Sequence, residues 1–184
     1  MRVLGIDPGT HRCGAGIIDG EGNRYKLVEA FVIKTKATAP IEARLYQVFS
    51  EIKRLIAEFK PDVLALEGLF YAKDIQAVVR IGEARACAML AAQENKLPIF
   101  EYAPTAVKQS VTGNGRATKE QVQFMVTKLL NLKEMPYADS ADALAIAICH
   151  LHNRHRSPKM PSGQKKREPN RLTRFIEATK KAKK

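Results

Sequence analysis

Cysteine is scarce in this chain of 184 residues, and the three that occur lack the spacing of a metal site. Cys13, Cys87 and Cys149 are odd in number and form no Cys-x-x-Cys pair, which argues against a disulfide framework and against a zinc site. The four histidines add no ligand pattern to them, and we interpret them as structural or surface residues. We therefore expect reduced thiols and a cytoplasmic protein.

Long apolar runs are also missing. No run approaches the length of about 18 residues that a membrane-spanning helix needs, so the sequence predicts no such helix. The first apolar run starts at Val3, which leaves no room for a signal peptide ahead of it. Both absences agree with the expected cytoplasmic location.

Negative charge is the scarcer sign, because 31 Lys and Arg stand against 19 Asp and Glu and give a formal net charge of +12. Residues 154–184 alone hold 12 Lys and Arg and 2 Glu. This balance predicts a polyanionic partner, either nucleic acid or an acidic membrane surface. We expect a folded domain over residues 1–155 and a basic, flexible tail over residues 156–184, with a short helix after Asn170 as the alternative.

Short apolar runs separated by turn residues predict strands at the beginning of the chain. Val3–Ile6 and Ala15–Ile18 flank the turn at Pro8-Gly9-Thr10, and Tyr25–Thr35 is rich in β-branched and aromatic residues. The other expected elements are strands at Val63–Leu66 and Leu97–Tyr102, and helices after Pro40, over Asp74–Asn95, and from Pro104, Thr118 and Asp139.

This order predicts an α/β fold with a five-stranded mixed sheet and helices on both faces. A right-handed crossover would place the fourth strand beside the first and parallel to it. The helix over Asp74–Asn95 is rich in small residues, which suit either tight packing on its own sheet or a dimer interface.

Four acidic residues stand at the ends of apolar segments. Asp7 and Glu67 each follow a strand, and the predicted topology brings them together at the sheet edge where α/β proteins bind ligands. Asp139 and Asp142 are three residues apart and share one face of the last helix. Three of the acids also have a purely structural alternative: Asp7 as a turn former, Asp139 as a helix N-cap, and Asp142 as an acid favoured by the helix dipole.

Convergence of these acids would need compensating cations, because two carboxylates about 4 Å apart repel by roughly 4 kcal/mol at an effective dielectric of 20. Oxygen ligands without Cys or His favour Mg²⁺, with Mn²⁺ as a substitute. Two such ions per site can activate a water and stabilise the leaving oxygen of a phosphodiester. A nuclease also agrees with the charge balance.

Four segments in order resemble the RuvC family of bacterial Holliday-junction resolvases. They are G-I-D-P-G-T, the acid of L-E-G-L-F-Y, V-K-Q-S-V-T-G-N-G-R-A-T-K-E-Q-V and A-D-S-A-D-A-L-A-I-A, within roughly residues 2–153. The resemblance implies an RNase H-like fold and a homodimer that resolves four-way DNA junctions by symmetric, Mg²⁺-dependent nicks. It also implies a role in recombination and repair, and the RuvA–RuvB branch-migration complex as partner.

The resemblance assigns roles to seven residues. Asp7, Glu67, Asp139 and Asp142 would be the catalytic acids and metal ligands. Lys108 and Lys119 would contact DNA, the alternative being a solvated helix face. Phe70 would stack on a base at the junction point, the alternative being a hydrophobic lid on the following helix.

Three other functions fit parts of the pattern. An actin-like or sugar-kinase ATPase shares the apolar-Asp-x-Gly-Thr segment but needs a second domain and a second Gly-rich loop. A non-catalytic DNA-binding module would not need four acids. A related RNase H-like nuclease acting on RNA or RNA–DNA hybrid is the main alternative.

Overall fold

A computed structural model describes residues 1–22, 24–68 and 74–154 and contains one five-stranded sheet. The sheet order is β3-β2-β1-β4-β5. β1 pairs antiparallel with β2 and parallel with β4, and β4 pairs parallel with β5. The mixed sheet and the position of the fourth strand beside the first are confirmed. The strands are β1 Arg2–Asp7, β2 Arg12–Glu21, β3 Arg24–Lys34, β4 Val63–Glu67 and β5 Ile99–Tyr102.

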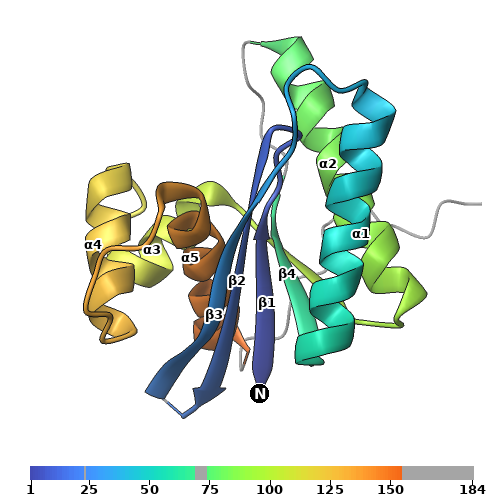
Figure 1. Cartoon of the computed structure of the whole chain (residues 1–184). Coiled ribbons are helices and arrows are strands. Elements are labelled where there is room, and N and C mark those ends of the chain that lie inside the picture. The colour runs from blue at the N-terminus through green and yellow to red at the C-terminus, as the bar shows by residue number, and fades with distance from the viewer. Residues whose placement is uncertain (23, 69–73, 155–184) are drawn as a thin grey trace, which may run out of the picture.

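Helices cover both faces of the sheet, as predicted (Figure 1). α1 and α2 lie on one face, whereas α3, α4 and α5 lie on the other. Among the helices that the structure describes, none is long and apolar enough to cross a membrane. The helices are α1 Ile41–Phe59, α2 Ile75–Glu94, α3 Pro104–Thr112, α4 Lys119–Leu129 and α5 Ala138–Asn153.

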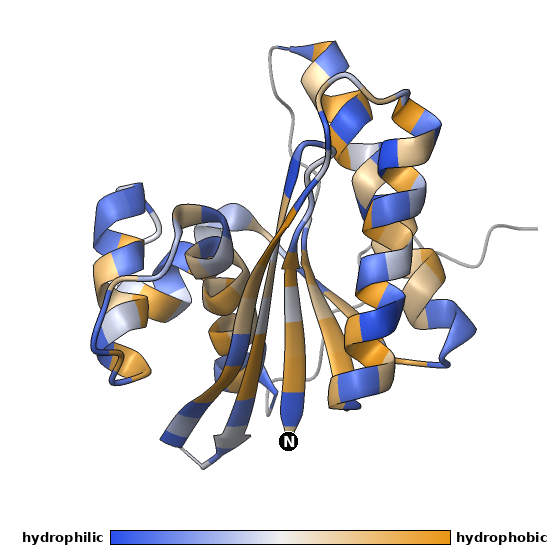
Figure 2. Cartoon of the chain, in the orientation of Figure 1, coloured by the Kyte–Doolittle hydropathy of each residue, from blue (hydrophilic) through white to orange (hydrophobic). Residues whose placement is uncertain are grey.

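The alternation of side chains along the strands divides the core into two layers. Leu4 and Ile6 of β1 pack toward α1 and α2, whereas Val3 packs toward α3, α4 and α5. In Figure 2 hydrophobic residues run along the central strands, whereas α1 alternates between hydrophobic and hydrophilic residues. Since every second residue faces the same layer, Asp7 is directed to the α5 side of the sheet.

Glycines let α5 lie directly on β1 and β2. A Cβ atom at Gly5 would come within 2.1 Å of the carbonyl oxygen of Ala143, and one at Gly14 within 2.0 Å of the carbonyl oxygen of Asp139. Any side chain there would push the helix off the sheet. The glycines therefore fix the height of the first turn of α5 above the end of β1.

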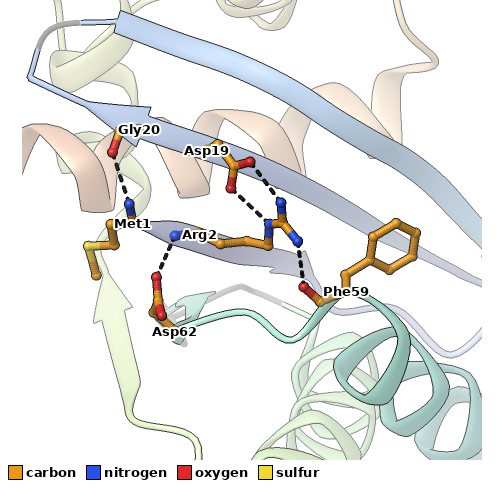
Figure 3. Close-up of polar contacts among 6 residues, drawn as sticks. All are labelled: Met1, Arg2, Asp19, Gly20, Phe59 and Asp62. Carbon is orange, nitrogen blue, oxygen red and sulfur yellow. Dashed lines mark hydrogen bonds and ion pairs between the residues drawn. The ribbon is translucent and has the colours of Figure 1, made fainter.

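Arg2 ties the start of β1 to its neighbours, at the opposite end of the strand from Asp7 (Figure 3). Its guanidinium donates to both carboxylate oxygens of Asp19 at 2.8 Å and to the carbonyl of Phe59 at 2.8 Å. The backbone nitrogen of Arg2 donates to Asp62 at 2.6 Å. This network anchors β1, β2 and the end of α1 far from the acids.

Four of the small residues of α2 are buried inside the chain, whereas Ala86 is exposed. They are Ala84, Ala88, Ala91 and Ala92, and the last three belong to the core on the α1 side of the sheet. These four follow the packing alternative. The large apolar side chains that α2 leaves exposed are Ile75, Val79, Ile81 and Leu90.

Candidate active site

Asp7 and Glu67 end two adjacent parallel strands and face the same side of the sheet. Ile6 pairs with Leu66, so each acid follows a paired, fully buried residue. Together with Asp142 they line a pocket of about 220 Å³ between the sheet, α3, α4 and α5. The convergence predicted from strand order and helix spacing is therefore confirmed for these three acids.

Asp139 is held beside this pocket by an arginine. Both Nε and Nη2 of Arg12 lie 2.6 Å from Oδ2 of Asp139. The N-cap of α5 is Tyr137, without a side-chain capping bond, so the N-cap alternative for Asp139 is wrong. Asp139 lies in the first turn of the helix, one turn before Asp142.

Two lysines line the pocket with the acids. Lys119 Nζ lies 2.7 Å from Oδ2 of Asp142, and Lys108 also lines the pocket. The side chain of Lys119 is 54% exposed, as on a solvated helix face, but its ammonium is paired with an acid of the site.

Capping residues define the start of the helix that carries Lys119 and the end of the helix that carries Lys108. Thr118 and Gln121 form a capping box, which starts α4 with Lys119 as its first residue. Gly113, with φ of 76°, ends α3 in the left-handed conformation five residues after Lys108.

Burial and mutual repulsion oppose ionisation of the acids. Desolvation, followed by the charges of Asp142 and Glu67, raises the pKa of Asp7 to about 7. Desolvation and the charge of Asp142 also raise the pKa of Glu67, although Lys108 and Lys119 oppose the rise. The hydrogen bond to Asp142 raises the pKa of Lys119. The pocket thus carries excess negative charge that its lysines compensate in part.

The turn after Asp7 is clamped by a buried arginine from α1. Arg44, only 4% exposed, donates from Nη2 to Oγ1 of Thr10 at 2.8 Å and from Nε to the Thr10 carbonyl at 3.1 Å. Its Nε also lies 3.3 Å from the hydroxyl of Thr35. Within residues 1–22, 24–68 and 74–154 no hydrogen bond joins the Asp7 carboxylate to the turn, so the turn-former alternative for Asp7 is not supported.

The donor set suits a hard divalent cation. Carboxylate oxygens from Asp7, Glu67 and Asp142 share one pocket, and Mg²⁺ prefers such ligands. In the described part of the chain no three Asp, Glu, His or Cys side chains are already arranged as a metal-ion site. Two of the four acids are engaged by side-chain cations instead, Asp139 by Arg12 and Asp142 by Lys119.

Comparison with known proteins agrees with this geometry. The family model of crossover junction endodeoxyribonuclease RuvC matches residues 3–150. The chain belongs to the RuvC family. The RuvC of Syntrophomonas wolfei is 44% identical over 154 residues, which are 83% of this chain and 90% of that protein. The RuvC of Alkaliphilus oremlandii is 46% identical over 83% of this chain and 93% of that protein.

Solved RuvC structures have the same fold. The structure of T. thermophilus RuvC in complex with a Holliday junction substrate matches with a TM-score of 0.80 and 34% identity, covering 84% of this chain and 94% of that chain. The yeast mitochondrial resolvase Ydc2 matches with a TM-score of 0.58 and 15% identity, which shows the fold alone. The expected RuvC membership and RNase H-like fold are confirmed.

The structure adds two residues to those predicted from the sequence, Arg12 and Arg44. Both contact the segments that carry the acids. Phe70 and the basic tail 156–184 lie outside the described residues. The roles assigned to the four acids, the two lysines and Phe70 remain predictions.

Proposed function

We propose that this chain is a structure-selective endodeoxyribonuclease that resolves four-way Holliday junctions by paired, symmetric hydrolysis of phosphodiesters, in recombination and DNA repair. RuvC membership supports the substrate and the reaction class. The pocket carries the proposal chemically, because three carboxylates and two lysines converge where a phosphate could enter.

The acids would hold the metal. Asp7, Glu67 and Asp142 line the pocket. Asp139 lies in the first turn of α5, three residues before Asp142. We propose that the four bind two Mg²⁺ ions, for which Mn²⁺ can substitute. Bound ions would lower the pKa of a water and stabilise charge on the leaving oxygen. The raised pKa of Asp7 is consistent with a site that needs added positive charge.

The lysines would receive the DNA backbone. Lys108 and Lys119 stand on α3 and α4, across the pocket from the strand ends that carry Asp7 and Glu67. Ammonium groups at such a rim attract phosphates and position them without reading sequence. Phe70 follows β4 by three residues, and we propose that it stacks on an opened base of the junction.

A homodimer would supply the second active site that symmetric nicking requires. The exposed apolar side chains of α2 are the candidate contact: Ile75 is 76% and Val79 53% exposed, and both line a shallow cavity with Ile41 of α1. Resemblance to the family extends the proposal to the RuvA–RuvB complex as partner.

The chain is proposed to divide into a nuclease domain, residues 1–155, and a basic tail, residues 156–184, that acts in the cytoplasm on DNA. The 12 Lys and Arg of residues 154–184 support a general attraction to phosphate backbones.

Cleavage of labelled substrates tests the function. A four-way junction, a linear duplex and an RNA–DNA hybrid are each incubated with Mg²⁺ or with a chelator. We expect paired nicks in the junction only, and only with Mg²⁺. Preferential cutting of the hybrid would favour the alternative nuclease that acts on RNA.

A further inference from the structure

Arg12 faces the acids because of strand alternation. In β2, a Cβ at Gly14 or Gly16 would meet α5, whereas Cys13 and Ala15 pack in the core on the α1 side. Arg12 therefore lies on the α5 face of the sheet, as the two glycines do. It is the first residue of β2. Its side chain extends from the sheet to the first turn of α5.

Contact with Asp139 concentrates on one oxygen. Two nitrogens of the Arg12 guanidinium lie 2.6 Å from Oδ2 of Asp139. The side chain of Arg12 is 49% exposed and that of Asp139 is 23% exposed. Pairs between exposed side chains contribute little net stability. The contact is therefore well defined yet weak enough to be displaced.

The place that Arg12 occupies is unfavourable for a cation without the acid. The N-terminus of α5 carries the positive end of the helix dipole, which repels a guanidinium and attracts an anion. Asp139 reverses this local balance and holds Arg12 there. Lys119 has the equivalent relation to Asp142, so two acids of the site each hold one side-chain cation.

We propose that Arg12 is a positioning residue that keeps Asp139 oriented in the metal-free enzyme and leaves it when a divalent cation binds. The inference rests on the proposed metal-dependent function and deepens it. In the metal-free state Arg12 offsets repulsion between Asp139 and the acids of the pocket. A divalent cation held by Asp139 would compete with Arg12 for the same carboxylate, so binding has to overcome the ion pair.

The proposal predicts that loss of Arg12 strengthens metal binding. Loss of a residue that only supports the structure would weaken metal binding or leave it unchanged. Loss of a competitor for a ligand oxygen strengthens it. A contribution of the size found for partly exposed ion pairs corresponds to about a two- to fivefold change in dissociation constant.

The test is calorimetric titration of Mn²⁺ into the metal-free full chain without DNA, comparing wild type with Arg12→Gln and Arg12→Lys. Lys34→Gln is the matched control, because Lys34 pairs with Arg12 across β2 and β3 and loses the same charge without contacting Asp139. We expect Arg12→Gln to bind Mn²⁺ about two- to fivefold more tightly. Arg12→Lys should lie between it and wild type, and Lys34→Gln should resemble wild type.

Thermal unfolding provides the second readout. We expect Arg12→Gln to lower the melting temperature in chelator but not in saturating Mn²⁺, since Arg12 is off Asp139 in the bound state. A loss of equal size in both conditions would show a merely structural role and overturn the inference. Unchanged or weaker Mn²⁺ binding by Arg12→Gln would overturn it too, while the proposed function stands. A wild-type chain that binds no Mn²⁺ would overturn both.

Discussion

Lys119 Nζ lies 2.7 Å from Oδ2 of Asp142, and this ion pair joins the first residue of α4 to α5 across the pocket. An ammonium in that position can neutralise the acid before DNA arrives and then contact a phosphate. Lys119→Met should therefore lower junction cleavage by about 10²-fold, the size found for loss of one electrostatic stabiliser. Single-turnover rates at saturating Mg²⁺ measure this.

Lys128→Met is the control for Lys119, because Lys128 stands on the same helix with its Nζ 5.4 Å from the ring centroid of Phe124. We expect it to cleave at close to the wild-type rate. Equal losses in the two variants would mean that general positive charge on α4, and not the pair with Asp142, supports the reaction.

Asp7 gives the metal-free protein a characteristic pH dependence. Its pKa is raised to about 7 in the folded state, so between about pH 4 and 7 the folded chain binds more protons than the unfolded chain. This contribution to the free energy of unfolding therefore falls as pH rises through that range. In chelator, Asp7→Asn should gain stability over wild type from pH 5 to pH 8.

His150 contributes a pH dependence of stability of the opposite sign, which the experiment has to subtract. Burial lowers its pKa to about 4, so its contribution is lost as pH falls from about 6.5 toward 4. The difference between wild type and Asp7→Asn removes this term, because both contain His150. A difference that does not vary with pH in thermal or urea unfolding would contradict the raised pKa of Asp7.

Arg44 should matter for both stability and cleavage. Arg44→Met leaves the buried oxygens of Thr10 without their donor, which should lower the free energy of unfolding by about 1–3 kcal/mol. Since the turn follows Asp7 directly, cleavage per folded molecule should fall as well. Urea unfolding and single-turnover cleavage measure the two effects.

Arg54→Met is the control on the same helix. Arg54 pairs with Glu51 and Glu58 at the surface, and its side chain is 50% exposed. Such pairs contribute about 0–1 kcal/mol, so this variant should be nearly as stable as wild type and fully active. An Arg44→Met chain with normal cleavage would show that the clamp does not position Asp7.

The basic tail should add salt-sensitive affinity without selecting junctions. Deletion of residues 157–184 removes 10 Lys and Arg. We expect weaker binding to linear duplex and a shallower slope of log K against log salt concentration, with junction cleavage at low salt largely intact. Fluorescence anisotropy over a salt series measures the slope. An unchanged slope would mean that the tail does not touch DNA.

Local patterns in the sequence were sufficient to predict the elements and three of the acids in the pocket. Asp7 and Glu67 could be placed together because both end apolar strands whose order follows from the crossover rule. Asp142 followed from the start of the last helix. These inferences depend on spacing within one element or on the order of elements, which a single chain displays.

Contacts between distant segments could not be predicted in this way. Arg12 and Asp139 are 127 residues apart in the chain. Their contact cannot be inferred before the packing of α5 on β2 is known. Arg44 did leave a signal, because it interrupts the apolar stripe of its helix next to Leu45 and Val48. A charged residue on a buried helix face is expected to have a specific polar partner, here Thr10.

The central claim is that the four acids bind the metal that cleaves junctions. Its most direct test is cleavage of a labelled four-way junction in Mg²⁺ by the wild type and by Asp7→Asn, Glu67→Gln, Asp139→Asn and Asp142→Asn, with junction affinity measured in parallel. The account predicts that each variant loses cleavage and binds the junction at least as tightly as wild type, since a repulsive charge is gone. A variant that cuts at near the wild-type rate would contradict it.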